Sequence, residues 1–310
     1  MIPDKKKITL GDNVARIEAL LTEVVLRPRR DFIRWAQLTK QTPNMKIGYP
    51  GQHLASLISG MEGERTGARG HDLCDGSEVK SCSRVDQLDT CQRCEAAVAR
   101  IEASCPECGS GDVKRNNDSK WLISVRSQEE LDYLLGEVPR VLLIITDYLD
   151  FESMDWSKLR IQAFEIWPAS PRHRHFRTLM ENYRNKIFLP HVAKNPGKSP
   201  APKNFWPYSF QFFMCNPVRT FFASVSNANV DPAITIHEYV APDADRGKLL
   251  PVPMPWDVLN KDEQGAMTRL LGSRIAQVKV SGLSESDRSN LELRDTDRAV
   301  AHEKKYKRGG

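Results

Sequence analysis

Two short segments hold most of the residues that could do chemistry in this chain. In one of them, Cys91 and Cys94 form a C-x2-C pair, and ten residues later Cys105 and Cys108 form a second pair. Two such pairs can place four thiolates at the corners of a tetrahedron around one Zn²⁺. We expect a structural zinc site, because four sulfur ligands leave no coordination position for a reacting water. A redox dithiol is the alternative, and two pairs at this spacing argue against it.

The other segment contains two acids and a lysine: Asp72, Glu78 and Lys80. Carboxylates are hard ligands for Mg²⁺, which proteins usually hold through one or two of them together with phosphate oxygens. The metal lowers the pKa of a bound water, and an ammonium group beside it can orient that water. Residues two apart on a strand share a face, so Lys80 can stand beside Glu78. The alternative is a solvated hairpin, because charged hairpins are common.

The backbone around these acids must bring them to one face. We expect residues 65–84 to form a β-hairpin, because the segment is polar and punctuated by glycines. A two-residue turn would put Asp72 on the face opposite Glu78. A three-residue loop that ends with Gly76 in the left-handed conformation pairs the two acids and keeps Lys80 on the same face. If Asp72 and Glu78 share a metal, we therefore expect this three-residue loop, or a looser loop that keeps the two acids on the same face.

The block GYPGQHLASLISGMEGERTGARGHDLCDGSEVKSCSRVDQLD, residues 48–89, resembles type II restriction endonucleases of the PD-(D/E)xK superfamily, and among them the MamI family. In that signature an Asp at the end of one strand is followed by E-x-K in the next. The likeness covers about residues 45–225 and is also carried by the cysteine module and by NFWPYSFQFFMCNP. The usual proline before the Asp is missing, since Gly70-His71 precedes Asp72.

This resemblance implies Mg²⁺-dependent hydrolysis of double-stranded DNA at a specific, interrupted palindromic site. It implies that Asp72 and Glu78 hold the metal and that Lys80 orients the attacking water. A two-fold site implies a homodimer in which each protomer cuts one strand. Two alternatives are a PD-(D/E)xK nuclease of repair or mobile elements and a non-enzymatic, zinc-dependent DNA-binding protein.

Many nucleases of this superfamily place a further acid on the helix before the hairpin. Glu62 and Glu64 are the candidates in this chain. We favour Glu62, because Gly63 would end the helix just after it. A surface helix end is the alternative interpretation for both.

Residues 170–204 are strongly basic, with eight arginines and lysines against one glutamate. A phosphate backbone favours such charge, and Arg and Asn can read guanine and adenine. A solvated basic face is the alternative. The aromatic residues that follow, at 205–213, are expected in the core. We expect DNA contacts from Ser81, Ser83, Arg84, Arg172, Arg174, Asn182 and Asn185.

The order of periodic segments predicts an α/β (α+β) fold: a PD-(D/E)xK restriction-endonuclease-like core with a zinc-binding insert and helical N-terminal elements. We expect helices at 12–26, 31–38, 53–61, 127–135 and, between the cysteine pairs, 95–103, and strands at 141–146 and 159–167. The expected regions are a helical N-terminal region (1–50), a nuclease core (51–225) with the zinc module at 86–118, a C-terminal extension (226–282) and a flexible charged tail (283–310).

The composition is that of a globular protein. The chain has 310 residues, 40% hydrophobic and 27% charged, with a formal net charge of +5, which excludes collagen-like and globally disordered classes. The basic N-terminus lacks the apolar stretch of a secretory signal. No apolar run reaches the length of a membrane span. These features lead us to expect a cytoplasmic protein with no membrane partner.

Overall fold

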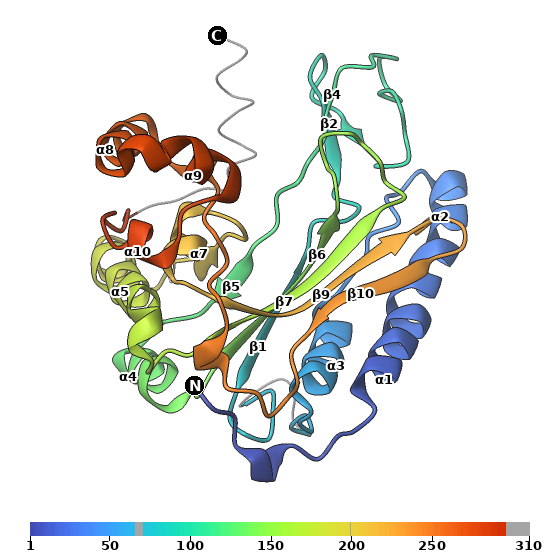
Figure 1. The fold of residues 1–310 in the computed structure, drawn as a ribbon. Helices are drawn as coiled ribbons and strands as arrows, with labels where there is room; N and C mark the ends of the chain where they lie inside the picture. The colour runs from blue at the N-terminus through green and yellow to red at the C-terminus, as the bar shows by residue number, and fades with distance from the viewer. Residues whose placement is uncertain (66–70, 199, 296–310) are drawn as a thin grey trace.

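A five-stranded mixed sheet forms the centre of the computed structural model, which describes residues 1–65, 71–198 and 200–295. The strand order is β1-β6-β7-β9-β10 (Figure 1). β1 runs parallel to β6, and every other neighbouring pair is antiparallel. The strands are β1 (Glu78–Ser83), β6 (Val141–Tyr148), β7 (Leu159–Ile166), β9 (Val218–Ser226) and β10 (Ala233–Tyr239).

The two central strands predicted from the sequence are confirmed. All eight residues of β6 are buried, as an apolar run in a sheet covered on both faces requires. Its side chains alternate between two cores: Leu142 and Ile144 pack into one, and Leu143 and Ile145 into the other. The sheet therefore separates two layers of helices.

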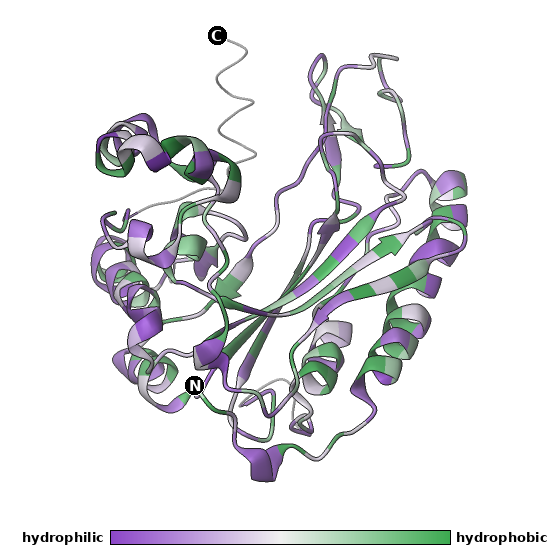
Figure 2. Cartoon of the chain, viewed as in Figure 1, coloured by the Kyte–Doolittle hydropathy of each residue, from purple (hydrophilic) through white to green (hydrophobic). Residues whose placement is uncertain are grey.

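One face of the sheet is covered by α1 (Asn13–Leu20) and α3 (Gly48–Ser59), with α2 (Arg27–Thr39) continuing from α1 through a π-helical turn. Figure 2 shows the apolar sides of α1 and α3 turned toward the strands. Ile17, Leu54 and Ile58 are fully buried there. The N-terminal helices are thus packed onto the core sheet, as their periodicity predicts.

The opposite face is covered by shorter elements that include the aromatic segment. Phe205 and Phe212 are fully buried beside Phe164 of β7. The prediction that the aromatic residues form core is confirmed for the four phenylalanines of 205–213, whereas Trp206 and Tyr208 are half-buried. No helix in the described part of the chain is long and apolar enough to cross a membrane. The elements of this layer are β5 (Trp121–Ile123), α4 (Gln128–Asp132), α5 (Arg174–Asn182), α6 (Leu189–Lys194), β8 (Lys203–Phe205) and α7 (Phe210–Met214).

The chain ends in α8 (Lys261–Leu271), α9 (Ile275–Ser281) and α10 (Glu285–Arg288). The expectation of a flexible tail from residue 283 is wrong for residues 283–295. Arg288 is only 4% exposed and donates hydrogen bonds of 2.9 Å to the carbonyl oxygens of Phe213 and Val252. Leu283 and Leu291 are also buried in the core beside it. These few apolar residues stand among many charged ones, so the low overall hydropathy of the segment did not predict its packing. The rest of the expected tail, 296–310, lies outside the described residues.

A small three-stranded sheet projects from one end of the central sheet (Figure 1). Its strands are β2 (Asp89–Cys91), β3 (Ala97–Val98) and β4 (Val113–Lys114), in the order β3-β2-β4. The helix expected between the cysteine pairs is wrong, because β3 and turns occupy that segment. Arg100 donates to both carboxylate oxygens of Asp89 at 2.8 Å and lies 4.7 Å from the ring of Trp156 in the main body. This contact docks the module.

Candidate active site and metal centre

Glu78 and Lys80 lie on the same face of the first strand and form an ion pair. β1 pairs with β6, and no second strand pairs with it among the described residues, so it is an edge strand. Both side chains line a pocket of about 130 Å³ whose other walls include Val141 of β6 and Leu134. The acid and the base are therefore held on a rigid strand and open toward solvent.

Asp72 does not belong to the expected hairpin. Its segment forms a bridge between Leu73 and Gly63 instead of pairing with β1. Gly76 has the expected positive φ of 91°, and its N–H donates to the carbonyl oxygen of Leu73 at 2.9 Å. The turn residue was predicted correctly, but the strand pairing was wrong, because β1 pairs with β6 and leaves its other edge free.

The side chain of Asp72 reaches this free edge. Its Oδ2 accepts a hydrogen bond of 2.7 Å from the backbone N–H of Val79, which has no strand partner on that side. Its Oδ1 accepts a hydrogen bond of 2.8 Å from Nε2 of Gln52, on α3. The acid is thus fixed by β1 and α3 together, although its own segment is not a strand of the sheet.

Gln52 is a residue that sequence reasoning missed. The preceding residue, Gly51, lets α3 approach the sheet closely, since a Cβ there would lie 2.0 Å from Oγ of Ser81. This close approach brings the next side chain, Gln52, to Asp72. A glycine inside an otherwise regular helix was the available signal, because such a position often marks close packing.

Burial and the nearby negative charge of Glu78 raise the pKa of Asp72, while the N–H of Val79 and the charge of Lys80 act in the opposite direction. Asp72 and Glu78 thus bring two carboxylates to the open edge of β1, and carboxylates are ligands that a divalent cation such as Mg²⁺ prefers. The oxygen donor set fits Mg²⁺ better than a softer metal.

Tyr133 and His71 lie next to the candidate catalytic residues. Tyr133 follows α4 and lines the same pocket, with 36% of its surface exposed. Its hydroxyl oxygen lies 2.5 Å from Nδ1 of His71, the residue just before Asp72. Burial and the charge of Glu78 raise the pKa of Tyr133, so the phenol keeps its proton at neutral pH. Neither residue was predicted, because they meet only in the folded chain.

Glu62 is not at the end of a helix. α3 ends at Ser59, with Gly60 in the left-handed conformation (φ 69°), so the helix stops earlier than Gly63. The Glu62 carboxylate accepts a hydrogen bond of 3.2 Å from the hydroxyl of Thr9. The position expected for it was wrong, and its catalytic role remains a prediction.

The residues that follow Lys80 are less accessible than expected. Arg84 is 4% exposed, donates to the carbonyl oxygen of Pro207 at 3.0 Å and stacks over Tyr208. The hydroxyl of Ser81 is buried against α3. As DNA contacts these two assignments are wrong, because the sheet is covered on both faces there. Ser83 accepts a hydrogen bond from the N–H of Val85 at 3.2 Å and stays an untested candidate.

Arg172, at the start of the basic segment, is a structural anchor. Its Nη1 donates to the carbonyl oxygen of Leu249 at 2.8 Å, and burial lowers its pKa. The contact that we expect between Arg172 and DNA remains a prediction, and it would have to replace this hydrogen bond. Arg174 and Asn185 are exposed and Asn182 is half-buried, so these three remain predicted DNA contacts.

The basic segment also adjoins the wall of the catalytic pocket. Arg184 donates to the side-chain oxygen of Gln128 on α4 at 3.1 Å. Arg177 donates to the carbonyl oxygen of Leu135 at 2.8 Å. The neighbours of these acceptors, Glu130 and Leu134, line the pocket of Glu78 and Lys80. Positive charge far along the chain is thereby brought close to the candidate catalytic residues.

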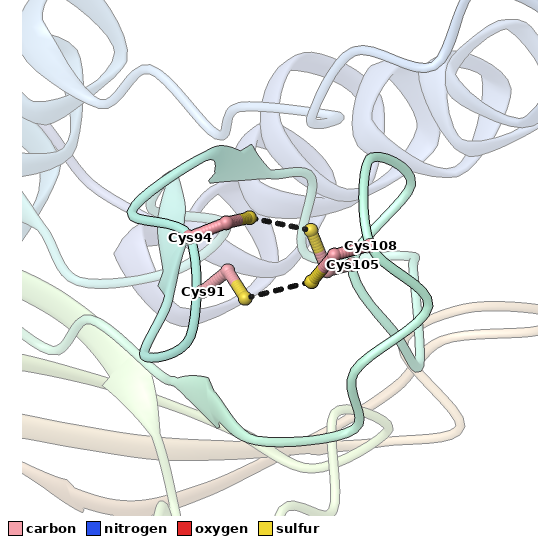
Figure 3. Close-up of side chains that lie close together, drawn as sticks. All are labelled: Cys91, Cys94, Cys105 and Cys108. Atoms are coloured by element: carbon pink, nitrogen blue, oxygen red, sulfur yellow. Dashed lines mark hydrogen bonds between the residues drawn. The ribbon is translucent and has the colours of Figure 1, made fainter.

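The four cysteines of the small module converge (Figure 3). All four sulfurs lie within 4.8 Å of one another, and the Cys91–Cys108 and Cys94–Cys105 distances are both 3.6 Å. A tetrahedron with Zn–S bonds of about 2.3 Å has edges of about 3.8 Å. The backbone N–H of Cys94 contributes most to lowering the pKa of Cys91 to about 7. The donor set and its spacing therefore fit a zinc ion.

The two halves of this centre have the same local geometry. The residue after each pair, Glu95 or Gly109, has a left-handed φ of 60° or 69°. Its N–H donates to the carbonyl oxygen of the first cysteine of its pair at 3.0 Å in both halves. The buried core of the module consists of Cys91, Val98 and Cys105 alone among the described residues. A core of this size gives little stability by itself, and a metal held by the four cysteines is one way to supply more.

Two comparisons with known proteins match restriction endonucleases. A family model for the MamI restriction endonuclease matches residues 34–257. The type II restriction enzyme MamI of Microbacterium ammoniaphilum is 34% identical over 82 residues, 26% of this chain and 27% of that protein. The aligned part thus spans about a quarter of that relative. No solved structure matches. Because the family model covers well over half of the sequence, the chain belongs to the MamI restriction endonuclease family.

Proposed function

We propose that this protein is a type II restriction endonuclease that hydrolyses double-stranded DNA at a specific site with Mg²⁺. The convergence of Asp72, Glu78 and Lys80 at the open edge of β1 carries the proposal. The family match and the MamI enzyme support the reaction class. The same residues are the ones that a PD-(D/E)xK active site requires.

Each of the three residues has a separate task in this reaction. Asp72 and Glu78 would hold Mg²⁺, which supplies Lewis-acid stabilisation and a more acidic bound water. Gln52 and the N–H of Val79 keep the Asp72 carboxylate in place. Lys80, paired with Glu78 in the free protein, orients the attacking water toward the scissile phosphate.

The cysteine centre has a structural role in this proposal. Zn²⁺ held by Cys91, Cys94, Cys105 and Cys108 has four protein ligands and leaves no site for a reacting water. The module that it stabilises docks on the main body through Arg100.

We further propose that the protein acts as a homodimer on an interrupted palindrome. One pocket per protomer cuts one strand, so two copies related by a two-fold axis are needed for a double-strand break. Arg174, Asn182 and Asn185 lie on the basic segment beside the pocket wall and are the proposed DNA contacts.

Digestion of plasmid DNA by the purified protein, with and without Mg²⁺, tests this function. Discrete fragments whose sequenced ends share one interrupted palindrome are the expected result. A Mg²⁺-dependent smear would favour a nuclease without a fixed site, as in repair or mobile elements. Tight binding without any cutting would favour a non-enzymatic DNA-binding protein.

A further inference from the structure

Tyr133 lines the pocket beside Glu78 and Lys80, and its hydroxyl is a polar group that the PD-(D/E)xK signature does not include. The other side chains around it are largely apolar, including Ile123, Leu134 and Val141. Tyr133 therefore brings a hydroxyl to a mostly apolar wall next to the two charged residues. A hydrogen-bond donor at such a wall acts more strongly than one in water, because the local dielectric constant is low.

His71 fixes this hydroxyl from outside the pocket. The imidazole and phenol ring centroids are 5.6 Å apart, and the hydroxyl oxygen lies 2.5 Å from Nδ1 and 3.2 Å from Nε2. Nδ1 also lies 3.2 Å from the carbonyl oxygen of Gly76. A carbonyl oxygen only accepts, so this contact favours a proton on Nδ1.

The direction of the Tyr133 proton follows from this arrangement. When Nδ1 carries a hydrogen shared between the carbonyl oxygen of Gly76 and the phenol oxygen, Tyr133 acts as an acceptor toward His71. Its own O–H can then be donated either to the unprotonated Nε2, 3.2 Å away, or to an acceptor that enters the pocket. The pocket that Tyr133 lines is also lined by Glu78 and Lys80.

We propose that Tyr133 is a further catalytic residue, whose hydroxyl donates a hydrogen bond to a non-bridging oxygen of the scissile phosphate, and that His71 is its positioning residue. The inference rests on the proposed nuclease function. The hydrogen bond strengthens as negative charge builds up on the phosphate oxygens, so it acts on the rate of the bound complex more than on DNA affinity.

Single-turnover cleavage by Tyr133→Phe tests the role of the hydroxyl. Loss of one donor to a charged phosphate should slow cleavage about 10- to 100-fold. DNA affinity measured without Mg²⁺ should stay within about twofold. Tyr239→Phe is the matched control, because it removes the same atom from β10 at the opposite edge of the sheet, and it should cut at the wild-type rate.

A double-mutant cycle tests the role of His71. His71→Phe keeps a ring but removes both nitrogens, and it should slow cleavage less than Tyr133→Phe does. The double variant should be no slower than Tyr133→Phe alone, because His71 acts only through the hydroxyl. Additive losses would show that His71 has an independent role and would overturn its assignment as a positioning residue.

Sulfur substitution at the scissile phosphate distinguishes contact from a structural effect. Sulfur accepts hydrogen bonds poorly, so one of the two phosphorothioate diastereomers should slow the wild type markedly more than it slows Tyr133→Phe. Equal sulfur effects in both proteins, or a wild-type rate for Tyr133→Phe, would overturn the contact. A wild-type protein that cuts no DNA would overturn the nuclease function and this inference with it. If the wild type is active, a wild-type rate for Tyr133→Phe overturns only the role of Tyr133.

Discussion

The cysteine module and the open edge of β1 are both candidate metal sites, and they are built in opposite ways. The module takes all four ligands from the 18 residues between Cys91 and Cys108 and has almost no other core. The edge site gathers Gln52, Asp72 and Tyr133 from separate segments onto a sheet that has its own two cores. Under the proposed function, a metal would support folding in the module and chemistry at the edge.

The acids of the two sites also differ in how their charges are paired. In the module, the buried carboxylate of Asp89 is neutralised by Arg100 and Arg115, each at 2.8 Å. At the edge, Asp72 faces Glu78, and burial raises its pKa. Asp89 is thus fully paired with cations, whereas Asp72 lies near the like charge of Glu78, as is common at reactive sites. The following predictions test this contrast.

The largest effect is expected from Cys105→Ser. Loss of one of four ligands should remove zinc and most of the soluble protein together, because metal binding and folding are coupled in a module with so small a core. Metal analysis should find about one zinc per wild-type chain. Cys74→Ser, outside the module, is the control and should keep both zinc and solubility. A zinc-free, fully active wild type would contradict a structural zinc.

Arg100→Ala should destabilise the folded protein by about 3 kcal/mol, because it leaves the carboxylate of Asp89 buried with one cationic partner fewer. Arg115 still contacts Asp89, which keeps the effect at the low end of the range for broken buried pairs. Urea unfolding with zinc present measures the loss. Arg93→Ala, an exposed arginine of the same module, should change the stability little, and equal losses in both variants would contradict the pairing argument.

Arg174→Ala should weaken DNA binding about 3- to 10-fold at low salt and reduce the salt slope by about one if it contacts a single phosphate. Titration of a labelled duplex at several salt concentrations measures both quantities. Arg16→Ala, on the opposite helical layer, is the control for a general loss of positive charge. Identical effects of the two substitutions would show that the basic segment is a solvated face.

The smallest effect concerns Asp72→Asn, which should raise the melting temperature of the metal-free protein by at most about 1 °C at pH 7, because Asp72 is only half-buried and solvent screens its charge. The raised pKa of Asp72 means that its contribution to stability falls as the pH rises through that pKa. The gain should therefore disappear below the pKa, where the wild-type carboxyl is neutral. Asp231→Asn, an exposed acid, should show no such pH dependence, and a lower melting temperature at pH 7 for Asp72→Asn would contradict the sign.

The sequence predicted best what is local. Four cysteines at fixed spacing define their own site, and the i, i+2 relation places Glu78 and Lys80 on one face of any strand. The apolar run at Val141–Ile145 is long enough for a buried strand and too short for most helices. These features depend on residues close together in the sequence, so tertiary contacts between distant segments do not alter them.

What the sequence did not predict depends on contacts between distant segments. The partner of β1 is β6, more than 50 residues away, so the expected hairpin did not form. Gln52 reaches Asp72 from 20 residues earlier in the chain, and Tyr133 reaches the pocket of Glu78 from more than 50 residues later. Charge alone also cannot tell a guanidinium that meets DNA from one that binds carbonyl oxygens inside the protein, as Arg84 and Arg172 do.

The central claim is that Glu78 and Lys80 perform the chemistry while the fold and DNA binding depend on other residues. Single-turnover cleavage by Glu78→Ala and Lys80→Ala, together with duplex affinity in the absence of Mg²⁺, tests it most directly. Glu238→Ala is the matched control, because it breaks the ion pair with Arg219 at the opposite edge of the same sheet. Cleavage by both test variants should fall at least about 10³-fold, with affinity within about threefold of wild type and the control fully active. A near wild-type cleavage rate in either test variant would contradict the assigned active site.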